Sequence, residues 1–221
     1  MEIRVYPEVE VPNQFRTQIA ELREEAWPGA GGDAHDPLLR PVTVLLVTPS
    51  ATGGAACEVV AALDVLTKDI THAGQTYRAA GLSAVVTATA HRGKGNGRQL
   101  VAAARELIAG SGSLPSAARR VDVARADVSP ADVAQADVAR ADVALFTCDR
   151  PLRGFYESAG WECLDGTVLI GGTPHDPFPS DGPGFDKVTM AGFFTERAMR
   201  HAAAFRHSRI ALHPGEIDRL W

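Results

Sequence analysis

Cysteine and lysine are scarce in this chain of 221 residues. The three cysteines, Cys57, Cys148 and Cys163, are odd in number and far apart, which predicts neither a disulfide framework nor a zinc knuckle. Only three of the 22 basic residues are lysines, a bias typical of GC-rich codon usage, and we expect a bacterial protein.

The chain also lacks a basic excess and long apolar runs. Its net charge of −5 and pI near 5.8 argue against a nucleic-acid-binding protein, so we expect no nucleic-acid partner. No apolar run approaches the roughly 20 residues that a membrane-spanning helix needs, and the charged start MEIRVYPEVEVP has no signal-peptide core. These absences predict a cytoplasmic protein without membrane contact.

Apolar residues make up 45% of the chain, and their spacing predicts an α+β fold. Where strands come before helices, they do so mainly in the middle of the chain, which favours a mixed sheet over a doubly wound parallel one. The expected strands are 1–7, 42–47, 58–67, 82–89, 141–149, 167–172 and 186–193. The expected helices are 13–27, 97–108, 151–160 and 195–209.

Residues 121–145 contain five imperfect copies of a five-residue unit. The unit resembles that of pentapeptide-repeat proteins, but 25 residues make barely one coil of such a structure, and stacked repeats need several layers. The interpretation is a tandem expansion in a loop at about 111–140, with an interaction arm as the alternative. We expect one domain over 1–221, ending in a helical tail at about 193–221.

A glycine-rich stretch lies where a predicted strand becomes a helix, in AVVTATAHRGKGNGRQLVAAARELI (84–108). A helix N-terminus presents unpaired N–H groups and partial positive charge, and glycines let the backbone approach an anion closely. Three basic side chains accompany the glycines. The predicted pyrophosphate cradle consists of Arg92, Gly93, Lys94, Gly95, Asn96, Gly97 and Arg98; the alternative is a glycine-rich turn without a ligand.

Two common phosphate-binding motifs do not fit this stretch. A Walker loop would need Ser or Thr after Lys94, and a dinucleotide fingerprint would need glycine where Arg98 or Leu100 stands. The pattern (R/Q)-x-x-G-x-(G/A) does fit, with Arg92, Gly95 and Gly97.

This pattern and the later FYESAGW (155–161) together resemble the GNAT superfamily of acyl-CoA-dependent N-acetyltransferases. The two motifs are farther apart than usual by about the length of the repeat. The tail PGEIDRLW is also similar to aminoglycoside 2'-N-acetyltransferases. The resemblance implies a central mixed, mostly antiparallel sheet, flanked by helices and splayed between its middle strands.

The resemblance implies acetyl-CoA as cosubstrate and no metal. Its pantetheine arm would bond to the backbone of Val85 and Thr87, and the N–H near Val86 would polarise the thioester carbonyl. The acceptor would be a primary amine of an unidentified small molecule, attacking directly; a homodimer is left open. The alternative function is a non-catalytic acyl-CoA sensor or interaction protein on the same fold.

Tyr156 matches the family's usual general acid, with a core tyrosine as the alternative. We expect Phe155 in the core and Tyr156 at the edge of the acyl site.

For the general base we expect Asp64, with Asp69 and His72 as alternatives. In the aminoglycoside 2'-N-acetyltransferases the corresponding carboxylate would fall close to Ser83, which cannot act as a base.

Overall fold

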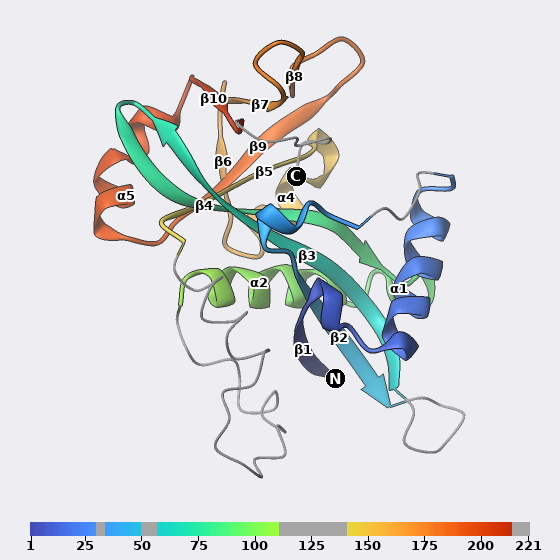
Figure 1. The fold of residues 1–221 in the computed structure, drawn as a ribbon. Coiled ribbons are helices and arrows are strands. Elements are labelled where there is room, and N and C mark those ends of the chain that lie inside the picture. The colour runs from blue at the N-terminus through green and yellow to red at the C-terminus, as the bar shows by residue number, and fades with distance from the viewer. Residues whose placement is uncertain (30–33, 50–56, 111–140, 214–221) are drawn as a thin grey trace.

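A computed structural model describes residues 1–29, 34–49, 57–110 and 141–213 (Figure 1). The predicted repeat loop at 111–140 and the last part of the predicted tail, 214–221, lie outside these residues. Within the described part, no helix is long and apolar enough to cross a membrane.

A seven-stranded sheet forms the centre of the molecule, in the order β1-β2-β3-β4-β5-β9-β6. Its neighbouring strands are antiparallel except for the parallel pair β4 and β5, which confirms the predicted fold class. The strands are β1 (Glu2–Pro7), β2 (Val42–Pro49), β3 (Cys57–His72), β4 (Gln75–Thr87), β5 (Val143–Asp149), β6 (Glu162–Leu164) and β9 (Lys187–Phe193).

Helices cover both faces of this sheet (Figure 1). Because side chains of a strand alternate between faces, Leu45 of β2 packs with Phe15 of one helix, whereas Leu46 packs with Leu100 of another. The main helices are α1 (Asn13–Ala26), α2 (Asn96–Ile108), α4 (Arg153–Glu157) and α5 (Glu196–His201). α1 therefore lies on the face opposite α2 and α4.

A second sheet has the order β10-β7-β8, with β7 (Val168–Gly172), β8 (Pro177–Pro179) and β10 (Arg209–Ala211). The prediction of a helical tail is wrong after Phe205, because Ile210 is buried where β10 pairs with β7. The start of the tail is as predicted, since the Thr195 hydroxyl accepts a hydrogen bond from the Ala198 N–H at 3.2 Å. The strands β6, β8 and β10 were not predicted; with three residues each, they are too short to show a period.

The strand predicted at 82–89 begins much earlier, at Gln75, and ends at Thr87. Ala73 and Gly74 form the tight turn before it. Both have positive φ, as a two-residue hairpin turn of type I′ requires. The early half of β4 escaped prediction because residues 79–81 are alanine and glycine, which give little apolar signal although they are buried.

The middle of the sheet opens on one side of β4. β4 and β5 pair only at Ala79 with Val143 and at Ala80 with Ala144, which confirms the predicted splay. On the other side of β4, a β-bulge places Ala84 and Val85 opposite a single residue of β3, and Ala84 has a φ of 48°. Bulges of this kind redirect a strand next to active sites, and the left-handed backbone costs about 1–3 kcal/mol.

Candidate active site

The predicted cradle forms the turn into α2, and its three glycines meet two different needs. Gly93 and Gly95 have φ values of 71° and 81°, which glycine adopts most easily. Gly97 allows a close approach instead, because a Cβ there would meet the Thr87 Oγ1 at 2.8 Å. Gly95 precedes the helix without a side-chain cap, and the first turn holds no acidic residue. The first N–H groups of α2 are thus left for another acceptor.

Two basic side chains of the cradle, Arg92 and Lys94, bond to the backbone of the turn itself. Arg92 donates from Nε to the Thr87 carbonyl at 3.0 Å, and Lys94 donates from Nζ to the Ala90 carbonyl at 2.8 Å. Both bonds brace the turn, and the bond from Arg92 also engages the Thr87 carbonyl, one of the groups predicted to bond pantetheine. Asn96 is buried and donates to the His91 carbonyl at 3.1 Å, which also holds the turn.

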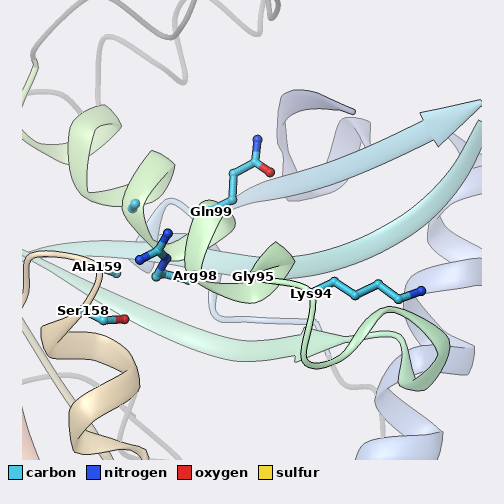
Figure 2. Close-up of a pocket in the computed structure, with 7 residues that line it drawn as sticks. Lys94, Gly95, Arg98, Gln99, Ser158 and Ala159 are labelled. Atoms are coloured by element: carbon cyan, nitrogen blue, oxygen red, sulfur yellow. The ribbon is translucent and has the colours of Figure 1, made fainter.

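A cleft of about 640 Å³ lies between the start of α2 and the end of α4. Figure 2 shows Arg98 extending from α2 toward Ser158 and Ala159, while Lys94 extends the opposite way. Arg98 is exposed and therefore supplies positive charge to this space. The cleft is lined by Lys94, Gly95, Arg98, Gln99, Ala102, Ser158 and Ala159. Its size is within the range of small-molecule sites, roughly 300–1,000 Å³.

Tyr156 and Phe155 lie the opposite way round from the prediction. Tyr156 is 5% exposed and packs edge-on against Phe146 of β5, with 5.0 Å between ring centroids. Phe155 is only half-buried and lies against Gly97. Adjacent residues on a helix point about 100° apart, and only the tertiary packing selects which one faces the core. Burial raises the pKa of Tyr156, and the nearby Cys148 and Asp149 raise it further, so its hydroxyl is protonated at neutral pH.

Asp64, the predicted base, is fully buried on β3. Its Oδ1 accepts from the Thr43 hydroxyl at 2.8 Å, and its Oδ2 accepts from Arg23 of α1 at 2.5 Å. Both carboxylate oxygens are therefore engaged within the protein. The two alternatives lie near the hairpin end of β3, away from the bulge: Asp69 is exposed, and His72 Nε2 lies 2.8 Å from the Ala204 carbonyl.

Sequence reasoning missed a histidine beside this carboxylate. His35 Nδ1 lies 2.8 Å from Glu8 Oε1 and 3.7 Å from Asp64 Oδ2, and its Nε2 lies 3.2 Å from the Ser83 hydroxyl. Ser83 pairs directly with Asp64 across the β3–β4 ladder. No motif surrounds His35 in the sequence; a lone histidine in a polar loop was its one signal.

Burial and charge act in opposite directions on the His35 imidazole. Burial lowers its pKa, but the hydrogen bond to Glu8 and the charges of Asp64 and Glu8 raise it, while Arg23 lowers it. The net effect is a raised pKa. The imidazole therefore takes up a proton more readily than a free histidine does.

The ligand atoms of Glu8, His35 and Asp64 lie within 4.8 Å of one another, close enough to surround one cation. Glu8 and His35 already bond to each other, and Asp64 is bonded to Thr43 and to the permanently charged Arg23. We therefore describe the cluster as a hydrogen-bonded network and assign it no metal.

The splayed sheet and the glycine turn into α2 are features that the resemblance to the GNAT superfamily implied from the two sequence motifs. No family model matches the chain, and no curated protein matches it.

Several solved structures are similar in fold. Escherichia coli ElaA is 17% identical, with 86% of this chain and 97% of that chain covered and a TM-score of 0.49. An acyl-CoA N-acyltransferase from Pseudomonas aeruginosa is 12% identical, with the same coverage and a TM-score of 0.46. An aminoglycoside 6'-N-acetyltransferase complexed with coenzyme A is 16% identical, with 89% and 99% covered and a TM-score of 0.48.

Proposed function

We propose that this protein transfers an acetyl group from acetyl-CoA to a primary amine of a small molecule. One observation carries the proposal: the unpaired edge of β4 leads directly into the uncapped N-terminus of α2, beside a cleft of about 640 Å³. An extended ligand can add to such an edge as a strand does, and its phosphates can bind the helix N-terminus.

The chain offers matching groups along this path. Val85 and Thr87 lie on the part of β4 that has no β5 partner, and their backbone would bond the pantetheine arm. The amides of residues 92–98 would bind the pyrophosphate, with Arg98 neutralising part of its charge. The Thr87 carbonyl would have to exchange its bond to Arg92 for one to the ligand.

Direct attack then requires the protein to stabilise the negative charge on the carbonyl oxygen, to protonate the leaving thiolate and to deprotonate the amine. The neutral amine forms a bond to the thioester carbon, and the Val86 N–H stabilises the negative charge that develops on the oxygen. The carbon–sulfur bond breaks, and Tyr156, kept protonated by its raised pKa, gives its proton to the departing thiolate. The new amide nitrogen loses its second proton, which returns to Tyr156. A base must first remove a proton from the amine, which is an ammonium ion in neutral water.

Two measurements test the proposal. Calorimetry should detect binding of acetyl-CoA and of CoA, and thiol release should follow when ethanolamine, benzylamine, glucosamine or putrescine is added. Binding without turnover of any amine would favour the acyl-CoA sensor. Absence of binding by a folded protein would overturn both functions.

A further inference from the structure

Three segments that are far apart in the sequence meet at the bulge of β4. Glu8 follows β1, His35 precedes the turn Pro37–Leu39, and Ser83 lies on β4 immediately before Ala84. The backbone N–H of His35 also donates to Glu8, at 3.3 Å to Oε2. The carboxylate thus holds both the backbone and the ring of the histidine in place.

The bond to Glu8 fixes the chemistry of the imidazole. A carboxylate accepts hydrogen bonds, so Nδ1 carries a hydrogen and donates it to Glu8. In the neutral ring the lone pair is then on Nε2, the nitrogen that faces Ser83. Glu8 therefore points the basic nitrogen of His35 toward β4.

This nitrogen is directed at the start of the proposed acyl site. Ser83 is two residues before Val85, and the bulge formed by Ala84 and Val85 begins directly after it. The His35 side chain is 18% exposed and can be reached by a ligand, whereas that of Asp64 is 1% exposed. Among the described residues, the charged groups that act on the His35 pKa are Glu8, Asp64 and Arg23, and the two carboxylates favour a positively charged acceptor.

We propose that His35 is the general base of this acetyltransferase, positioned by Glu8, and this inference rests on the proposed function. An N–H bond of the acceptor ammonium breaks, its proton passes to His35 Nε2, and the freed lone pair on nitrogen forms the new bond to the acetyl carbon. Imidazolium then releases the proton to water. Asp64 stays bonded to Arg23 and Thr43, and its negative charge stabilises the imidazolium form of His35.

The test compares kcat/KM against pH for the native protein, His35→Asn, Glu8→Gln and Asp64→Asn, with the best of the four amines named above. In the native protein kcat/KM should rise with pH through the raised pKa of His35, above about 6.5. His35→Asn should reduce kcat/KM by about 10²–10⁴-fold near neutral pH. Its remaining rate should climb about tenfold per pH unit toward the pKa of the free amine, which is about 10 for a simple alkylamine.

Glu8→Gln separates positioning from simple structural support. Removing the carboxylate removes the bond and the charge that raise the His35 pKa. The rise of kcat/KM with pH (the limb of the profile) should therefore move to lower pH. A merely structural role would lower the rate at all pH values without moving the limb. The melting temperature and acetyl-CoA affinity of each variant show that the fold and the cosubstrate site remain intact.

Three outcomes overturn the inference. If His35→Asn keeps the limb and Asp64→Asn loses it, Asp64 is the base. If all variants keep the native profile, no member of the cluster takes the proton, although the acetyltransferase function stands. If the native protein acetylates none of the amines at any pH, the proposed function fails and this inference fails with it.

Discussion

Gly97 in the first turn of α2 touches Thr87 at the end of β4 so closely that a Cβ on the glycine would meet the threonine hydroxyl at 2.8 Å. Real Cβ atoms essentially never come so near another atom, so the Thr87 side chain or one of the two elements would have to move. The contact fixes the position of the helix N-terminus against the free edge of β4. The two parts of the proposed acetyl-CoA site are therefore mechanically linked.

This contact predicts that the effect of Gly97→Ala on the free energy of unfolding changes sign when Thr87 is replaced by alanine. Gly97→Ala should destabilise the native protein by about 1–3 kcal/mol through overpacking. In a Thr87→Ala background the hydroxyl is gone, and the same change should stabilise the protein by up to about 1 kcal/mol, because alanine is a better helix former. Urea unfolding of the four proteins measures both values. Equal effects in the two backgrounds would show that the contact carries no strain.

Gly95→Asn should weaken acetyl-CoA binding at least about tenfold, or about 1.4 kcal/mol. Asparagine tolerates the left-handed backbone of Gly95, and its side chain would occupy the cleft, since nothing lies within 4 Å of an added Cβ. Gly74→Asn is a matched control, with a similar φ and equally open surroundings in the β3–β4 turn. Calorimetry should find native affinity in the control. Native affinity in Gly95→Asn as well would remove the cradle from the cosubstrate site.

Tyr156→Phe should lower kcat by about 10²–10⁴-fold and leave acetyl-CoA affinity nearly unchanged, because only the transferable proton is removed. The ring keeps its packing against Phe146, so the melting temperature should change little. Tyr77→Phe is the control: Tyr77 is buried and its hydroxyl lies 3.1 Å from His201 Nδ1. That variant should lose about 1 kcal/mol of stability with full kcat. Full kcat in Tyr156→Phe, where chemistry limits the rate, would make Tyr156 a core tyrosine only.

Arg23→Met should destabilise the protein by about 3–5 kcal/mol, because it leaves the carboxylate of Asp64 buried without its charged partner. Arg150→Met removes an ion pair of similar length, 2.6 Å to Asp186, in which both side chains are more than half exposed. Such surface pairs contribute about 0–1 kcal/mol, so this control should change little. Chemical denaturation compares the two variants. Similar small losses would mean that Asp64 becomes protonated or hydrated when Arg23 is removed.

The stability contributed by His35 should depend on pH in the opposite direction to activity. Its folded-state pKa is raised, so the contribution is fully present below the unfolded pKa of about 6.5 and is lost as pH rises through the folded value. The native protein should therefore exceed His35→Gln in stability by more at about pH 5.5 than at about pH 8.5. Urea unfolding at both pH values measures the difference. In a Glu8→Gln background the dependence should shrink, and an unchanged dependence would assign it to another group.

Most of the sheet and the glycine turn into α2 were predictable from local sequence. The apolar runs at 42–47 and 58–67 predict β2 and β3 because a buried strand needs continuous apolar side chains. The turn at 92–98 was predictable for a similar reason, since positive φ and an uncapped helix start impose glycine on neighbouring positions. The short strands β6, β8 and β10 were not predictable, because three residues hold no periodicity.

The sequence by itself determined the elements whose causes lie within a few residues: the strand–turn–helix from β4 to α2, the capped start of α5 and the amphipathic α1. Only the tertiary structure decided that Tyr156 rather than Phe155 enters the core, because both rings suit burial and the direction of α4 selects between them. It alone brought Glu8 to His35, across 27 residues of chain, and His35 to Ser83, across 48. Such contacts depend on strand register and helix packing, which no local pattern encodes, whereas turns and periodic elements follow from the backbone preferences of neighbouring residues.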